Sequence, residues 1–133
     1  MSASLFEAAL DHVRTGRTLD QAFEQLLDAF FLAPTDDMKF AVLAEGPPLT
    51  GDPRLDALAG AVAEYLANQQ GLPRVPSWAS DPARILDRPW HMCATDDFGM
   101  RSYLSIVSPA EFRSHNVFTE ERPLRWGRSG RLH

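Results

Sequence analysis

The sequence has only one cysteine, one lysine and no long apolar run. Because Cys93 stands alone, no disulfide can form within the chain, and a reducing cytoplasm is the default location. No stretch approaches the roughly 20 apolar residues that a helix needs to cross a bilayer. The first residues include Glu7 and Asp11 and lack a basic start followed by an apolar run, so they do not resemble a signal peptide. We therefore expect a cytoplasmic protein that does not contact membranes.

Motifs for nucleotide and metal chemistry are also missing. The chain contains no G-x-x-x-x-G-K-[ST], no G-x-G-x-x-G and no H-E-x-x-H. His91 and Cys93 are the only two soft metal ligands that lie close together in the sequence, whereas a zinc site needs about four ligands, commonly supplied as two pairs. We therefore expect neither a metal nor another cofactor.

The same region keeps one enzymatic alternative open. Cys93 would need a general base and an oxyanion stabiliser to act as a nucleophile, and His91 or His115 could be the base. Asp96 and Asp97 could form a carboxylate pair, although helix capping explains both residues more simply. The sequence favours a protein without catalytic activity, and the alternative is a small enzyme that uses His91, Cys93 or Asp97.

Length and apolar pattern predict one mostly helical domain. At 133 residues, with 44% hydrophobic and 23% charged residues, the chain fits a single soluble domain. Apolar residues recur at helical spacing over 5–15, 19–32 and 53–70, and a shorter helix is expected over 37–44. The spacing over 53–70 is that of an amphipathic helix. The predicted fold class is all-α, with about four main helices.

Capping residues and helix breakers set the limits of two of these helices. Thr18 and Gln21 have the spacing of a capping box, in which each side chain bonds to the backbone of the other residue. Asp52 followed by Pro53 is a favoured helix start, because the carboxylate caps the first turn and proline fits its first position. Gly71 is expected to end the same helix.

A segment rich in proline and tryptophan follows. Residues 72–89 contain four prolines, so we expect an extended, irregular strap with one helical turn that starts at Asp81-Pro82. Trp78 and Trp90 are expected to pin this strap onto the helices.

The C-terminal part is predicted to contain two short elements and a tail. Residues 98–107 fit either a helix or a strand, and we favour the helix. Ser108-Pro109 then predicts the start of another short helix. We expect the domain to span 1–119 and residues 120–133 to form a flexible, basic tail.

Charge is distributed unevenly along the chain. Residues 1–70 carry four basic and eleven acidic residues, whereas residues 71–133 carry nine and seven. An acidic surface repels phosphate, so we do not expect the N-terminal half to bind nucleic acid. The second predicted helix begins LDQAFE at Leu19, and this acidic start excludes a DNA-reading helix-turn-helix.

The tail leaves a second alternative open. It contains four arginines at three-residue spacing: Arg122, Arg125, Arg128 and Arg131. Arginine with Trp126 could grip phosphates or stack on bases, so a nucleic-acid accessory protein is the second alternative. Glu120 and Glu121 oppose this reading, and Leu124 and Trp126 also fit anchors for a groove on another protein.

Four sequence blocks resemble a family of small bacterial proteins that is frequent in actinobacteria. In order they read EGPPLTGDPRLDALAGAVAEYLANQQG (45–71), LPRVPSW, LDRPWHM and SPAEFRSHNVFT, and they fall within residues 45–119. Genes of this family often lie beside a nucleotidyltransferase in arrangements like those of toxins and antitoxins. The resemblance implies an antitoxin-like, protein-binding regulator, and no enzymatic role is tied to these blocks.

Aromatic and arginine residues in these blocks are the candidates for a protein interface. Such residue types serve both packed cores and interface hot spots. With one residue of the tail added, the candidates are Trp78, Arg88, Trp90, Phe112, Arg113 and Trp126. The chain differs from the family at His91, where an aromatic residue is usual, and in lacking the helix-turn-helix of some members. We expect a cognate protein partner, with a homodimer as a further option.

Overall fold

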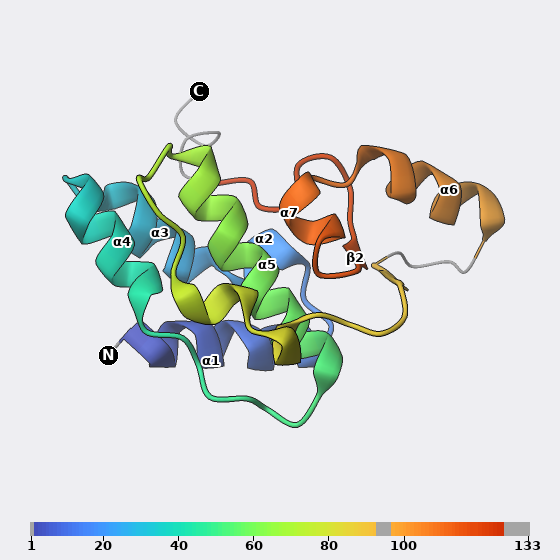
Figure 1. Cartoon of the computed structure of the whole chain (residues 1–133), viewed down its shortest axis with the longest axis horizontal. Coiled ribbons are helices and arrows are strands. Elements are labelled where there is room, and N and C mark those ends of the chain that lie inside the picture. Colours follow the sequence, from blue (N-terminus) through green and yellow to red (C-terminus); the bar gives the residue numbers. More distant parts are fainter. Residues whose placement is uncertain (1, 93–96, 127–133) are drawn as a thin grey trace.

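The computed structural model describes residues 2–92 and 97–126, and it confirms the predicted all-α class. In chain order the elements are α1 (Ser2–Arg14), α2 (Leu19–Ala22), α3 (Glu24–Leu32), α4 (Asp36–Ala44), α5 (Pro53–Gln69), the 3-10 helices η1 (Ser77–Ser80) and η2 (Pro82–Arg84), β1 (Trp90–His91), α6 (Phe98–Val107), α7 (Ala110–Arg113) and β2 (Val117–Phe118). Figure 1 shows α1 to α5 as the larger part of the molecule, with α6 at one end. Among the described helices, none combines the length and apolar character of a membrane span.

Helix α5 is the centre of the core. It starts where predicted, because Pro53 occupies its first turn and the Asp52 carboxylate accepts a hydrogen bond from the backbone N of Arg54 (3.0 Å). All residues from 55 to 63 are buried, so this part of α5 is covered on every side and is not amphipathic as predicted. Alanine and Gly60 dominate the stretch, and their small size lets neighbouring elements approach closely.

Helices α1 to α4 form the N-terminal part of the core. The fully buried rings of Phe6 and Phe23 meet edge to face, with centroids 6.3 Å apart. The helix predicted over 19–32 is divided, because Phe23 has φ −97° and ψ 10° and thereby leaves the helical geometry between α2 and α3. The break coincides with the burial of the Phe23 side chain.

The predicted strap crosses the helices through η1 and η2. The ring of Trp78 meets Phe6 edge to face at 5.3 Å, and its Nε1 donates a hydrogen bond to the carbonyl oxygen of Leu43 (2.8 Å). Phe6 belongs to α1 and Leu43 to α4. Trp78 therefore pins the strap to two helices at once.

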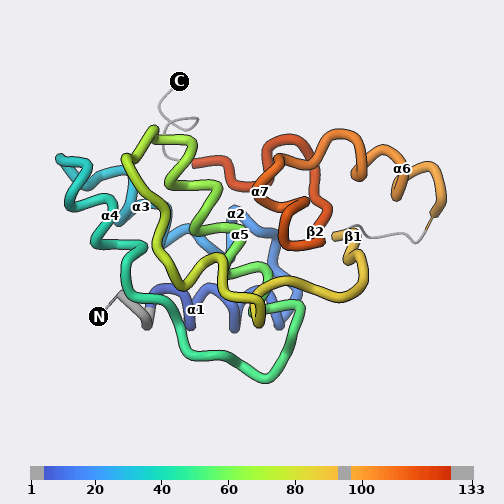
Figure 2. Tube along the Cα trace, viewed as in Figure 1, coloured from blue at the N-terminus to red at the C-terminus, as the bar shows by residue number. Residues whose placement is uncertain are grey.

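Two short strands form a pairing that was not predicted from the sequence. Strands β1 and β2 run parallel, with Trp90 opposite Val117 and His91 opposite Phe118. The backbone N of Met92 continues the ladder by donating to the carbonyl oxygen of Phe118 (2.8 Å). Because α6 and α7 lie between the strands in the chain, the pairing ties the C-terminal part to the end of the strap, as Figure 2 shows.

Residues 120–126 differ from the predicted flexible tail. Leu124 is buried, and the ring of Trp126 stacks on Phe31 with centroids 5.0 Å apart. Nε1 of Trp126 also donates a hydrogen bond to the Asp28 carboxylate (2.9 Å). Leu124 thus joins the hydrophobic core and Trp126 packs on α3, so both side chains are held against the helices.

Candidate functional site

Helix α6 confirms the helix that was favoured over a strand. Asp97 caps it by accepting a hydrogen bond from the backbone N of Gly99 (2.8 Å), so capping accounts for this carboxylate. At the other end, the Ser108 hydroxyl lies 2.5 Å from the carbonyl oxygen of Leu104 and 2.8 Å from that of Thr119. The backbone N of Thr119 donates to the same hydroxyl (2.8 Å). Both ends of α6 are therefore held by hydrogen bonds.

The solvent side of α6 is apolar. Phe98 and Ile106 are each 77% exposed and Tyr103 is 53% exposed, whereas Leu104 is buried. Arg101 is the one charged residue of the helix, and it is half-buried. A helix at a protein surface ordinarily presents polar and charged residues to water. The side of α6 that exposes Phe98, Tyr103 and Ile106, here called the α6 face, is therefore an unusual surface. Helix α6 lies at the end of the molecule, away from α1 to α5 (Figure 1).

His91 holds the middle of α6. Its ring stacks on Phe118 with centroids 4.9 Å apart, and its Nε2 lies 3.2 Å from the Ser105 hydroxyl oxygen. That hydroxyl donates its hydrogen to the carbonyl oxygen of Arg101 (2.8 Å). Because a hydroxyl has one hydrogen, Ser105 accepts from His91, and Nε2 of His91 carries a hydrogen. His91 therefore positions α6 against β1.

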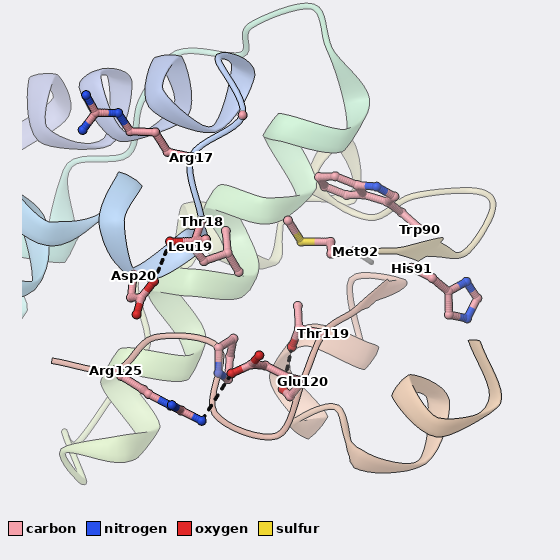
Figure 3. A pocket seen from close by; sticks show the side chains of 12 residues that line it. Arg17, Thr18, Leu19, Asp20, Trp90, His91, Met92, Thr119, Glu120 and Arg125 are labelled. Carbon is pink, nitrogen blue, oxygen red and sulfur yellow. Dashed lines mark hydrogen bonds and ion pairs between the residues drawn. The ribbon is translucent and has the colours of Figure 1, made fainter. Parts of the chain in front are cut away.

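A cleft of about 620 Å³ lies beside β1. Its walls come from residues 16–20 and 90–92 and from Thr119, Glu120, Pro123 and Arg125. Figure 3 shows Trp90 and Met92 on one side, with Leu19 among the residues that face them. The volume lies within the range of small-molecule sites, and the walls combine apolar and charged side chains.

Two acidic side chains that line the cleft, Asp20 and Glu120, bond to neighbours in the chain. Asp20 accepts hydrogen bonds from the Thr18 hydroxyl (2.8 Å) and from the backbone N of Gln21 (3.0 Å). Glu120 forms an ion pair with Arg125 at 3.6 Å. A specific small-molecule site needs polar groups that converge on the ligand. Because these groups are engaged within the chain, the cleft is a weaker candidate than the α6 face.

A buried polar cluster joins α5 to the strap and to the turn before β2. Nδ1 of His115 lies 2.5 Å from the carbonyl oxygen of Arg84, and Nε2 lies 2.5 Å from the Glu64 carboxylate. The carbonyl oxygen of Arg84 can only accept, so Nδ1 donates to it, and the bond between Nε2 and Glu64 carries its hydrogen on one of these two groups. No sequence motif signals this cluster, because its members lie 20 or more residues apart.

The Arg84 side chain extends the same cluster. Its guanidinium donates to the carbonyl oxygens of Pro47 (2.6 Å) and Asp56 (3.3 Å) and lies 4.7 Å from the centre of the Trp78 ring. Burial lowers the pKa of Arg84 below its ordinary value, and the negative charges of Asp56 and Asp81 oppose that shift. These bonds tie the loop before α5 to the strap, so the cluster stabilises the fold.

Four of the predicted interface residues, Trp78, Arg88, Phe112 and Arg113, differ in how far they are exposed. Phe112 is fully buried and packs edge to face on Tyr65 at 5.5 Å, so it offers no surface to a partner. Trp78 is half-buried and pins the strap. Arg88 and Arg113 are exposed.

The other two candidates are half-buried tryptophans. Trp90 lines the cleft and has the guanidinium of Arg54 at 5.2 Å from its ring centre. Trp126 packs on α3. Because Phe112 lies in the core, Trp78 packs against the core and Trp90 lines the cleft, the candidates do not form one surface.

The residues proposed for the enzymatic and the nucleic-acid-binding alternatives have structural roles or lie outside the described residues. His91 faces α6, and Asp97 caps it. Cys93 lies outside the described residues, as do Arg128 and Arg131. Within residues 2–92 and 97–126, no three His, Cys, Asp or Glu side chains gather as metal ligands would.

Comparison with known proteins does not assign the chain to a family. No protein-family model matches it. No curated protein matches it, and no solved structure does. Interpretation of the site therefore depends on its own geometry.

Proposed function

We propose that this chain is a non-enzymatic, protein-binding regulator and that α6 is its binding surface. The observation that carries the proposal is the uncharged apolar side of α6, on which Phe98 and Ile106 are each 77% exposed. Exposed apolar patches mark interaction sites, because covering them with a partner removes apolar surface from water. A helix with such a side binds in an apolar groove or against another helix.

The anchoring of α6 supports the same proposal. His91 bonds to Ser105 in the middle of the helix, and Ser108 bonds to Thr119 at its end. A surface that is ordered before binding loses less conformational entropy when the partner arrives. The apolar side of α6 is therefore presented in a fixed orientation.

The first partner to test is a cognate protein encoded by a neighbouring gene. This choice comes from the resemblance of residues 45–119 to antitoxin-like bacterial proteins. The excess of acidic residues over 1–70 would attract a basic partner and speed their encounter. On this proposal the chain is the antitoxin-like partner of a toxin in the cytoplasm, and a nucleotidyltransferase is the leading candidate for that toxin.

Co-expression with the neighbouring gene product tests the proposal. The tagged wild-type chain is compared with a Phe98→Ser/Ile106→Ser double variant and with Leu49→Ser. Leu49 is a matched control, because it is an apolar residue outside α6 that is 56% exposed. We expect the partner to co-purify with the wild type and the control but not with the double variant, while all three keep similar melting temperatures.

Two results would contradict the proposal in different ways. If the double variant retains the partner, α6 is not the binding surface. If the wild-type chain purifies without a stoichiometric partner, both from co-expression and from its native host, the protein-binding function itself is wrong.

A further inference from the structure

We infer that the occupant of the apolar α6 side is a second copy of this chain, bound by antiparallel pairing of two α6 helices. The inference rests on the proposed function, because it concerns the same binding surface, which a second copy covers when no cognate protein is bound. A two-fold contact requires a surface that is complementary to itself. The solvent side of α6 meets this requirement in spacing, charge and position.

The spacing of side chains on α6 is symmetric about Ser102. Phe98, Ser102 and Ile106 lie four residues apart and therefore form one row along the helix. With a two-fold axis at Ser102, Phe98 of each copy packs on Ile106 of the other. Ser102, a small residue, occupies the centre of this row, where the two helices approach most closely. Phe98 and Ile106 lie at the two ends of the row, and each packs once against the other copy.

The charge of the chain also favours this surface for self-association. The formal net charge is −5, so most contacts between two copies bring acidic residues together. The large side chains that α6 exposes are apolar, and Arg101, its one charged residue, is half-buried. Asp97 is the nearest acidic residue before the helix, and its carboxylate is turned to the backbone N of Gly99. Two copies can therefore meet through α6 without repulsion at the contact.

The position of α6 leaves room for a second copy. Figure 1 shows α6 at one end of the long axis, with its C-terminal end toward α7 and its N-terminal end directed away from the other helices. Antiparallel pairing therefore places the α1 to α5 parts of the two copies at opposite ends of the dimer.

The size of the surface sets the strength of the contact. A fully covered Phe or Tyr side chain buries about 150–250 Å². Because α6 has only 10 residues, two copies bury less than the roughly 1,200 Å² of a stable interface. We therefore expect a reversible dimer with a dissociation constant between about 1 μM and 1 mM. A cognate protein that uses the same side of α6 would compete with the second copy.

Sedimentation equilibrium tests the dimer. The wild-type chain is measured over about a hundredfold range of concentration, together with Ile106→Ser and the Leu49→Ser control. The average mass of the wild type and the control should rise from one chain toward two. Ile106→Ser should raise the dissociation constant about tenfold or more, because each dimer contains the Phe98–Ile106 contact twice.

A cross-link at the two-fold axis tests the geometry. Paired helices lie about 8–10 Å apart and Cα atoms lie about 2.3 Å from each axis, so two facing Cα atoms are about 3.4–5.4 Å apart. This separation overlaps the range of about 4.4–6.8 Å in which disulfides form. In a Cys93→Ser background, Ser102→Cys should yield a covalent dimer on mild oxidation. The control Ser77→Cys, an exposed position on η1, should not.

The outcomes separate this inference from the proposed function. A dimer that Ile106→Ser weakens and Ser102→Cys traps supports the inference. A dimer that persists unchanged in Ile106→Ser overturns it, because the second copy then binds elsewhere. A wild type that stays monomeric also overturns it, yet the proposed function stands if Phe98→Ser/Ile106→Ser still loses the cognate protein. If that double variant keeps the cognate protein and the wild type is monomeric, both proposals fail.

Discussion

Trp78 lies so close over Gly46 that a Cβ on Gly46 would be 2.3 Å from Cδ2 of the indole ring. The same ring donates its N–H to Leu43, packs on Phe6 and lies under the guanidinium of Arg84. One tryptophan thus joins α1, the end of α4, the loop that follows it and the strap. The close approach of ring and backbone at Gly46 is possible because glycine has no side chain.

Replacing Gly46 by alanine should therefore destabilise the fold. The added methyl group must displace the Trp78 ring, and overpacking of this kind costs about 1–3 kcal/mol. Urea unfolding should show a lower midpoint with an unchanged slope. Gly99→Ala is the control, because the nearest atom to its added Cβ is Asp97 Oδ1 at 3.4 Å, an ordinary contact. Equal midpoints for Gly46→Ala and the wild type would show that the ring can move away without cost.

The His115 cluster leads to a second prediction. In His115→Leu the buried carbonyl oxygen of Arg84 loses its hydrogen-bond donor, and an unsatisfied buried group costs about 1–3 kcal/mol. The free energy of unfolding, measured in urea, should fall by that amount. His12→Leu is the matched control, because His12 is only half-buried, and its free energy of unfolding should stay near that of the wild type. If both variants lost a similar free energy of unfolding, the cause would be the introduced leucine and not the lost hydrogen bond.

Local signals in the sequence predicted most of the helices correctly. One half of the predicted capping box is formed, because the backbone N of Thr18 donates to Gln21 Oε1 (3.4 Å), while the Thr18 hydroxyl bonds to Asp20. Asp52 with Pro53 starts α5 as predicted. Gly71 ends that helix with φ +62°, a backbone conformation that glycine adopts easily. These features depend on residues within one turn of each other, so the sequence alone is sufficient to find them.

The candidate site depends on contacts that the sequence does not contain. Phe98, Tyr103 and Ile106 are apolar, and which side of α6 is exposed depends on contacts such as that of His91 with Ser105, which lie 14 residues apart. Strands β1 and β2 have two residues each, too few for an alternating pattern to be recognised. Phe112 is the reverse case. The sequence made this aromatic residue an interface candidate, but its side chain fills the core.

Tyr65 predicts how stability depends on pH in alkaline solution. Burial raises its pKa above the ordinary value of 10.0, the charge of Glu111 adds to this, and that of Arg122 opposes it. The folded chain therefore holds the phenol proton more tightly than the unfolded chain. Below pH 10.0 both states keep the proton, and above it the unfolded state loses the proton first, so the free energy of unfolding falls as pH rises.

Tyr65→Phe should weaken this dependence, because phenylalanine has no proton to lose. Urea unfolding at several pH values from about 9 to 11 measures the slope for each chain. Tyr103→Phe is the control, since this tyrosine is exposed on α6 and should leave the slope as in the wild type. A Tyr65→Phe variant with the wild-type slope would mean that other groups cause the alkaline loss of stability.

The packing of Leu124 leads to the last prediction. Leu124 is only 6% exposed and belongs to the hydrophobic core, whereas the adjacent Arg125 is exposed and pairs with the exposed Glu120 at 3.6 Å. Leu124→Ala should lower the free energy of unfolding by about 2–5 kcal/mol, because it leaves a cavity in the core. Arg125→Ala should lower it by less than about 1 kcal/mol, since an exposed ion pair is weakened by solvent.

The comparison of these two variants distinguishes a packed segment from a charged tail. If residues 120–126 belong to the domain, the apolar substitution is the costly one, and chemical denaturation should show it as a lower midpoint in one cooperative transition. If they formed a solvated tail, neither substitution would change the midpoint. A large effect of Arg125→Ala together with none for Leu124→Ala would mean that charge, and not burial, holds the segment. Because the two positions are adjacent, position along the chain cannot explain a difference between them.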